Sequence, residues 1–196
     1  VLSTLYFIDQ GSRIKIVATV MIEGAGLVVQ SNLPINNWQD FLAYVRQSER
    51  PVKLGYKKAV FAHNLLFEDA LQASGITYSD DPHDTSAQLV LVDLFGAKNF
   101  IPAMENGLVD GFIAKQPYLA LAEVHSLGRV VSLLDDLPPA GRWQFSPCCA
   151  LAASDDYVAA NPEIVQAMVT LNLRAAALLS REPQKSAEQI SRWLDI

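Results

Sequence analysis

Apolar positions along this chain form two kinds of pattern, short unbroken runs and longer stretches with helical spacing. The short runs are bounded by turn residues, which is typical of buried strands. They predict strands at 14–20, 25–29, 52–56, 89–94, 109–114, 130–134 and 148–153. The spaced stretches predict helices at 38–47, 60–74, 118–125 and 183–194, and helices that begin at Ser154 and Pro162 and run through Leu179. Because helices separate most of the strands, we expect an α/β fold with mostly parallel sheets and helices on both faces.

One unit, residues 97–123, combines a helix, a turn, a strand and a second helix. Phe100 and Met104 fall at helical spacing, an Asn-Gly pair ends that helix, and the strand at 109–114 leads to Pro117, which suits a first helical turn. A helix N-terminus offers free N–H groups and the positive end of the helix dipole, so it is suited to hold a polar or anionic group. The residues delivered to this N-terminus are Lys115 and Gln116.

The chain opens on apolar residues at helical spacing, the pattern of the tail of an amphipathic helix that ends at Asp9. The strand at 14–20 follows directly, and a fold rarely begins in this order. Val1 is not a start methionine, and no leader of charged and apolar residues is visible. We therefore expect that the chain starts inside a longer gene product.

Composition narrows the function classes. The 196 residues carry a formal net charge of −6, and the 15 lysines and arginines are scattered, which does not favour nucleic-acid binding. The longest apolar stretches, 14–22 and 171–179, are too short or too interrupted to span a bilayer. The spacing of the three histidines predicts no metal site, and we expect no cofactor.

The order of five segments resembles periplasmic solute-binding proteins of ABC importers. The segments are GSRIKIVAT, GAGLVV, KLGYKKAVFAHNLLFEDAL, NFIPAMENGLVDGFIAKQPYLALAE and SPCCALAASDDYVAANPEIVQAM. The chain is most similar to the nitrate, sulfonate, taurine and bicarbonate group, which is related to the thiamine-precursor-binding proteins. The phrase GLVDGF followed by QP is the most specific part, although the family more often has an acidic residue where Gln116 stands.

The resemblance implies a two-lobed type II fold in which ligand sits in the cleft between lobes. Two chain crossings, at 25–29 and 147–152, would form the hinge. Residues 28–146 would be lobe 2, and residues 1–27 with 147–196 would be lobe 1. Family members are about a third longer at the N-terminus, so we expect lobe 1 to be incomplete. Ligand capture would be hinge closure, and a membrane permease would recognise the closed form.

Two strand ends are candidates for an anion site. Lys57 and Lys58 precede a helix whose first free amides belong to Ala59 and Val60, and such a group suits a carboxylate or a sulfonate. Ligands of open α/β sheets lie beyond the carboxyl ends of strands. The alternative is that both lysines are solvated on a surface loop. The other strand end carries the pair Lys115 and Gln116.

Four further residues are expected at the cleft. His63 lies one turn into the same helix, and the alternative is a partly buried surface histidine. Glu23 could accept hydrogen bonds from a ligand, although it could equally be a surface carboxylate. The approach through Pro147 and Cys148 would complete the site. An aromatic wall would favour a ligand with a planar or apolar part; its candidates are Tyr56, Phe95 and Trp143.

The cysteines and one carboxylate have competing interpretations. Cys148 and Cys149 are adjacent on an expected strand and therefore point to opposite faces. Three alternatives are open: a pair of small apolar side chains, a bridge to another chain, or a reactive site. A normal disulfide between neighbouring cysteines is disfavoured by geometry. For Asp110 we expect a structural role, in which its carboxylate caps backbone groups in the turn before the strand.

We therefore expect a non-enzymatic, extracytoplasmic subunit that binds an anion, a sulfonate or a pyrimidine-like molecule and delivers it to an ABC permease. The alternatives are a pyrimidine-synthase-like enzyme of the same fold, a ligand-sensing regulatory domain, or a partial chain that no longer binds. Because lobe 1 would be incomplete, the apolar stripe of Ile164, Met168 and Leu171 would be left open or would be covered by a second copy in a homodimer.

Overall fold

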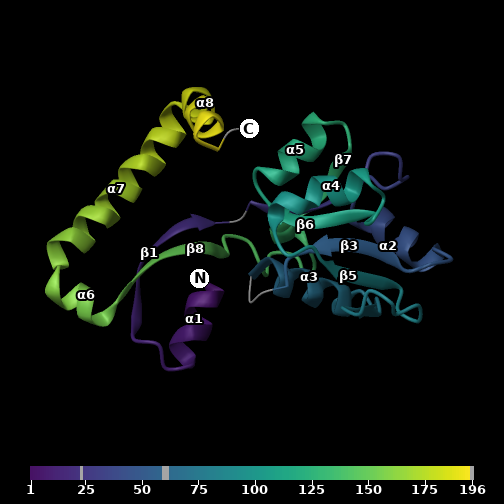
Figure 1. The fold of residues 1–196 in the computed structure, drawn as a ribbon, viewed down its shortest axis with the longest axis horizontal. Helices are drawn as coiled ribbons and strands as arrows, with labels where there is room; N and C mark the ends of the chain where they lie inside the picture. Colours follow the sequence, from purple (N-terminus) through teal and green to yellow (C-terminus); the bar gives the residue numbers. More distant parts are fainter. Residues whose placement is uncertain (23, 59–61, 195–196) are drawn as a thin grey trace. The chain divides into compact units, whose positions relative to one another are not determined.

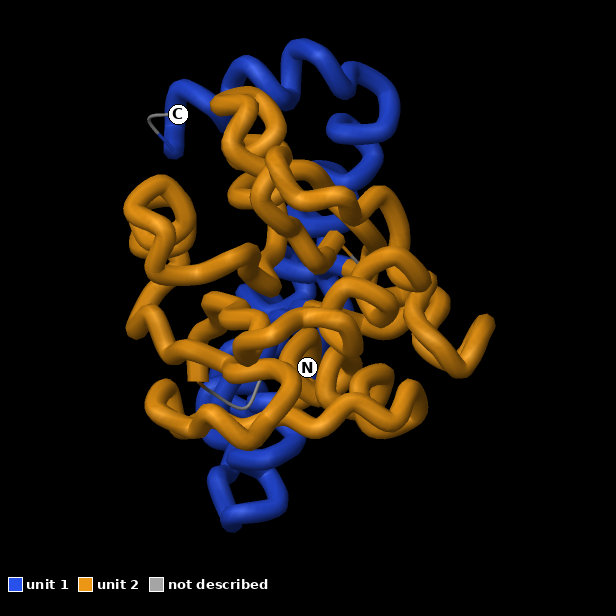
Figure 2. The backbone as a smooth tube through the Cα atoms, turned by 90° about the vertical axis from the view of Figure 1, so that its right-hand side faces the viewer, with its two compact units in different colours: residues 1, 3–21, 149–196 blue, residues 2, 22–148 orange. Residues whose placement is uncertain are grey.

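The computed structural model describes residues 1–22, 24–58 and 62–194. Figure 1 labels its helices and strands. Contacts divide the chain into two compact units. The larger unit holds residues 22–148 together with Leu2, and the smaller holds residue 1, residues 3–21 and residues 149–196 (Figure 2).

The larger unit is built around one six-stranded sheet with the order β4-β5-β3-β6-β2-β7. Its strands are β2 (Ala25–Gln30), β3 (Val52–Tyr56), β4 (Tyr78–Ser79), β5 (Leu89–Asp93), β6 (Gly111–Lys115) and β7 (Gly128–Leu133). Neighbours from β4 to β6 are parallel, whereas β2 runs antiparallel to both β6 and β7. The helices are α2 (Trp38–Gln47), α3 (Ala62–Ala73), α4 (Phe100–Glu105) and α5 (Tyr118–Val124), with 3-10 turns η1 (Ala97–Asn99) and η2 (Leu134–Asp136). The expected α/β class with a mostly parallel sheet is confirmed.

Helices cover both faces of this sheet, so its strands are buried on both sides. On one face α2 and α3 pack over alternate strand residues, and Phe41 and Phe67 are fully buried there. On the other face α4 and α5 enclose a second core, in which the rings of Phe100 and Phe112 stack with centroids 5.1 Å apart. Figure 1 shows α4 and α5 on the side of the sheet opposite α3. Helix α2 begins where Asn37 Oδ1 accepts a hydrogen bond from the Asp40 amide at 2.9 Å.

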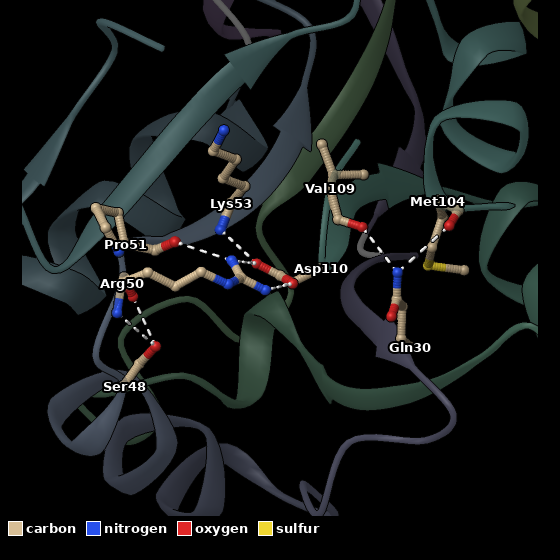
Figure 3. A network of polar contacts seen from close by, with 8 residues as sticks. All are labelled: Gln30, Ser48, Arg50, Pro51, Lys53, Met104, Val109 and Asp110. Atoms are coloured by element: carbon tan, nitrogen blue, oxygen red, sulfur yellow. Dashed lines mark hydrogen bonds and ion pairs between the residues drawn. The ribbon is translucent and has the colours of Figure 1, made fainter. Parts of the chain in front are cut away.

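The β3–β6–β2 region depends on close backbone approach and on one ion pair, in which a largely buried carboxylate meets a mostly exposed arginine. A Cβ at Gly111 would overlap the carbonyl oxygen of Val28 on β2. Just before β6, the Asp110 carboxylate accepts two hydrogen bonds from Arg50, at 2.6 and 2.8 Å, and one from the Lys53 amide at 2.8 Å (Figure 3). The expected structural role of Asp110 is confirmed, because its carboxylate accepts a backbone hydrogen bond.

The smaller unit contains a two-stranded sheet and three C-terminal helices. Its elements are α1 (Leu2–Asp9), β1 (Ile14–Ile22), β8 (Pro147–Ser154), α6 (Asp155–Ala160), α7 (Pro162–Arg181) and α8 (Pro183–Leu194). Strand β1 pairs with β8, and the Asp155 amide donates to the Arg13 carbonyl at 2.9 Å. None of the residues of α7 is buried. The exposed fractions of Ile164, Met168 and Leu171 are 49%, 43% and 60%, so the apolar stripe is open in this chain.

The boundaries between the units differ from the expected lobe boundaries at 27 and 147. Residues 22–27 belong to the larger unit, because Ala25 to Leu27 are hydrogen-bonded neighbours of β6 on one side and Gly26 and Leu27 of β7 on the other. At the other end, Pro147 and Cys148 begin β8 but count with the larger unit. Strand β4 and the two 3-10 turns were not expected from the sequence.

Candidate functional site

The larger unit carries a small concavity, partly open to solvent, against the described start of α3. The opposite wall comes from η2 and from the segment that leads into β8. Its lining residues are Ala25, Ala62, His63, Leu66, Leu134, Asp135, Trp143, Ser146, Pro147 and Cys148.

His63 is the buried histidine of this concavity, with 7% of its surface exposed. Burial, and to a smaller extent the nearby positive charge of Lys115, lowers the pKa of His63 to about 4. The imidazole is therefore neutral at pH 7. A neutral imidazole carries one donor and one acceptor nitrogen, so it can serve either kind of ligand group.

Trp143 forms an aromatic wall that is tied to α3. Its Nε1 is buried and has no hydrogen-bond partner among the described residues. The guanidinium carbon of Arg142 lies 4.7 Å from the centre of the Trp143 ring, and the same guanidinium pairs with Asp69 of α3 at 3.4 Å. The loop after η2 is thereby attached to the helix that carries His63 and Leu66.

The remaining lining is mostly apolar, from Leu66, Leu134 and Pro147. Asp135 adds a carboxylate with a buried Oδ1, and Ser146 adds a hydroxyl. No lysine or arginine is among the residues that line this concavity in the described part of the chain. The arrangement can hold a small group with an apolar face and a few hydrogen-bonding atoms.

Lys58 lies in a different concavity, which lies against β3, α3 and β4. That concavity is lined by Tyr56, Lys58, Asn64, Glu68, Tyr78, Ser79, Asp80 and Leu91. The Lys58 ammonium forms an ion pair with Asp80, and its amide donates to Asp93 Oδ1 at 3.1 Å. Burial raises the pKa of Glu68, which accepts a hydrogen bond from the Tyr78 hydroxyl at 3.4 Å.

The ten residues predicted for the site are divided among several places. His63, Pro147 and Cys148 line the concavity at α3, and Lys115 lies close enough to His63 to lower its pKa. Lys57 is exposed, and its carbonyl accepts a hydrogen bond from Asn64 Nδ2 at 2.9 Å. Gln116 is also exposed; its amide donates to the Gly24 carbonyl at 3.0 Å, and its Oε1 accepts from the Ala120 amide at 3.3 Å. Glu23, Ala59 and Val60 lie outside the described residues.

Sequence reasoning missed Asp135 and the apolar part of the lining. Asp135 directly follows the predicted strand at 130–134, so the rule that ligands lie beyond strand ends could have identified it. Leu66 and Leu134 carry no such signal, because a leucine that lines a pocket and a leucine in a core have the same pattern. The three aromatic residues predicted for the cleft lie in different places. Trp143 lines the concavity at α3, Tyr56 lines the concavity that holds Lys58, and Phe95 is 84% exposed.

Two further features are absent from the described residues. No group of three or more His, Cys, Asp or Glu side chains there is placed to hold a metal ion. Among the same residues, no helix is both long and apolar enough to cross a bilayer.

Comparison with known proteins gives a family match and a set of structural likenesses. The model of the NMT1-like family matches residues 2–195. No curated protein matches the chain. The alkanesulfonate-binding protein SsuA of Xanthomonas axonopodis pv. citri, bound to MOPS, is similar with a TM-score of 0.71 and 17% identity, over 100% of this chain and 60% of that one.

Two further solved structures give the same result. The periplasmic aliphatic sulphonate-binding protein SsuA of Escherichia coli has a TM-score of 0.69 and 19% identity, over 100% of this chain and 59% of that one. The ligand-binding component of an ABC-type import system of Staphylococcus aureus, with zinc bound, has a TM-score of 0.70 and 16% identity, over 97% of this chain and 58% of that one. At these identities the likeness concerns the fold, and the chain spans about three fifths of the length of each. The expected likeness to periplasmic binding proteins is confirmed.

Proposed function

Because the chain belongs to the NMT1-like family, we propose that it is the solute-binding part of an ABC importer, and that the concavity at α3 receives the solute. The observation that carries the proposal is the meeting of a neutral buried histidine, an indole wall and a carboxylate in one partly open concavity. Such a combination of apolar walls and a few polar atoms is typical of small-molecule sites.

In this proposal the concavity forms one wall of a cleft between two lobes, and closure about the hinge covers the bound solute. Lobe 2 corresponds to residues 28–146, and lobe 1 to the two flanking segments. Binding and closure need no covalent step, so the protein acts as a carrier and not as an enzyme. The proposed partner is a membrane permease, and the proposed location is extracytoplasmic. The open stripe on α7 supports a homodimer as a further proposal.

A second candidate function is a pyrimidine-synthase-like enzyme. The observation that favours it is that His63 and Cys148 line the same concavity, since an imidazole and a thiol are groups that enzymes use for proton transfer and nucleophilic attack. The two functions are distinguished by Cys148→Ser. A carrier keeps its solute affinity within a few-fold, whereas an enzyme loses turnover while still binding.

A thermal unfolding screen tests solute binding. The full chain is heated with nitrate, taurine, alkanesulfonates, bicarbonate and pyrimidines, each in large excess. A ligand present at a hundred times its Kd stabilises the folded state by about 2.7 kcal/mol, which raises Tm by roughly 5–10 °C in a chain of this size. Filling the concavity with Ser146→Trp should abolish the shift, while Ser126→Trp, on an exposed turn, should not. The absence of any shift across the panel would contradict the proposal.

A further inference from the structure

The concavity that holds Lys58 is a second candidate binding site in the larger unit. Its volume of about 550 Å³ falls within the range of small-molecule sites. It shares no described lining residue with the concavity at α3. We infer that this second concavity binds a small organic cation, whose ammonium group contacts the Glu68 carboxylate and the Tyr56 hydroxyl. The inference goes beyond the proposed function, because it concerns a separate site.

Tyr56 brings an unused hydroxyl to this concavity. Its side chain lies at the end of β3 with 4% of its surface exposed, and it is one of the lining residues. None of the hydrogen bonds in the described part of the chain involves its hydroxyl. Tyrosines that are buried this far normally have a hydrogen-bond partner. The hydroxyl therefore gains a hydrogen bond when a ligand supplies one.

Carboxylates outnumber cations around this hydroxyl. Burial raises the pKa of Tyr56, and the positive charge of Lys58 opposes this shift. Three carboxylates act in the same direction as burial; they are Asp80, Asp93 and Glu68. Lys58 is the one positive charge among the described groups that act on this pKa, and its ammonium already pairs with Asp80. The surroundings of the hydroxyl are therefore negative, which favours a cation.

Glu68 is the carboxylate of this group that lacks a strong partner. Asp80 pairs with Lys58, and Asp93 Oδ1 accepts a hydrogen bond from the Lys58 amide at 3.1 Å. In the described part of the chain, half-buried Glu68 forms no ion pair and accepts one long hydrogen bond, of 3.4 Å, from the Tyr78 hydroxyl. Burial raises the pKa of Glu68, and an approaching cation would favour its charged form.

The lining favours an organic ammonium ion over a metal ion. Within residues 1–22, 24–58 and 62–194, no three His, Cys, Asp or Glu side chains are placed to hold a metal. An ammonium group donates up to three hydrogen bonds, which suits a site with a carboxylate and a hydroxyl oxygen. The ring of Tyr78 and the side chain of Leu91 add surface for a short hydrocarbon chain. An anion would meet Glu68, while Lys58 is already paired.

Calorimetric titration with three four-carbon probes tests this inference. The probes 1,4-diaminobutane, 1,4-butanediol and succinate have similar lengths and differ in charge. The titrations use about 0.15 M salt, which screens exposed charges beyond about 8 Å. We expect the diamine to bind the full chain at one site, at least about tenfold more tightly than the diol, a difference of about 1.4 kcal/mol. Succinate should bind no more tightly than the diol.

Four variants locate the diamine. Glu68→Gln should remove most of the preference for the diamine, whereas Glu105→Gln, which neutralises an exposed carboxylate outside this lining, should preserve it. Tyr56→Phe should weaken diamine binding by about three- to tenfold. Its Tm should stay at the wild-type value, because the hydroxyl has no hydrogen bond to lose. Ser146→Trp, which fills the concavity at α3, should leave the Kd of the diamine within about twofold.

Each outcome has a defined meaning. The inference is overturned if the diol or succinate binds the wild-type chain as tightly as the diamine. Equal effects of Glu68→Gln and Glu105→Gln would overturn it too, because net charge would then explain the preference. Loss of diamine binding in Ser146→Trp would place the diamine at α3, against the inference. Circular dichroism checks folding, and Tyr56→Phe decides if Glu68→Gln does not fold. The thermal screen tests the proposed function separately, so either can fail alone.

Discussion

Arg142 lies with its guanidinium carbon 4.7 Å from the ring centre of Trp143, and it also pairs with Asp69 of α3 at 3.4 Å. The aromatic wall of the concavity is therefore held against the helix that carries His63. A cation over an indole contributes about 0.5–1 kcal/mol at an exposed site. The arrangement gives Arg142 a positioning role, although it does not line the concavity itself.

Arg142→Gln should loosen this wall. We expect the emission of Trp143 to shift to longer wavelength, and the affinity for the best solute of the thermal screen to fall by about two- to fivefold. Arg174→Gln, an exposed arginine on α7, serves as the control and should change neither. An unchanged Trp143 spectrum in Arg142→Gln would show that the stacking does not position the ring.

The ion pair between Arg50 and Asp110 should matter for stability and not for binding. Asp110→Ala removes two charge-assisted hydrogen bonds and leaves the Lys53 amide without its carboxylate, so the free energy of unfolding should fall by about 1–3 kcal/mol. Glu105→Ala, which removes an exposed carboxylate, should stay within about 0.5 kcal/mol. Urea unfolding measures both. A large loss of solute affinity in folded Asp110→Ala would contradict the purely structural role.

The burial of His63 predicts how the free energy of unfolding depends on pH. Its pKa is about 4 in the folded state and 6.5 in the unfolded chain, so the unfolded state binds the proton first as pH falls. The contribution of His63 is fully present above pH 6.5 and is lost between pH 6.5 and 4. By the linkage relation it amounts to up to about 3 kcal/mol.

Urea unfolding at pH 7.5 and pH 4.5 measures this effect. His63→Gln should flatten the pH dependence, because the amide does not titrate. His83→Gln, at an exposed loop position, should leave the pH dependence as it is in the wild-type chain. The account of a buried neutral histidine is wrong if the two variants have the same slope.

A substitution at Lys58 distinguishes the two concavities, because Lys58 lines only one of them. Its ammonium pairs with Asp80 beside Tyr56, away from the lining around His63. Lys58→Ala should therefore leave the calorimetric Kd for the best solute of the thermal screen within about twofold of wild type. A tenfold loss would place the solute at the second concavity, or would support the expectation from the sequence that Lys58 holds an anion.

Much of the fold could be predicted because it depends on local pattern. The strand at 52–56 and the helix at 38–47 have the predicted bounds, since an apolar run and an asparagine cap are both readable in the residues themselves. Strand β4 was missed because a two-residue edge strand has no period. The position of β2 between β6 and β7 was also not predicted, because strand pairing is not a local property.

The candidate site could be predicted only in part, for a related reason. His63, Pro147 and Cys148 were found through strand ends and a family resemblance, and they do line one concavity. The partner of Lys58 is Asp80, and no sequence pattern indicates which carboxylate a lysine will meet after folding. The electrostatics of the lining therefore became visible only in the three-dimensional arrangement.

The central claim is that a solute binds in the concavity beside Trp143, and a single-tryptophan titration tests it most directly. In the double variant Trp38→Phe and Trp193→Phe, Trp143 is the one remaining tryptophan. We predict a saturable change in its emission on addition of the best solute, with a Kd that agrees with calorimetry, and loss of both signals when Ser146→Phe fills the concavity. Two results together would contradict the account. One is that Ser146→Phe binds the solute with unchanged affinity in calorimetry, and the other is that the solute leaves Trp143 emission unchanged in the chain that keeps Ser146.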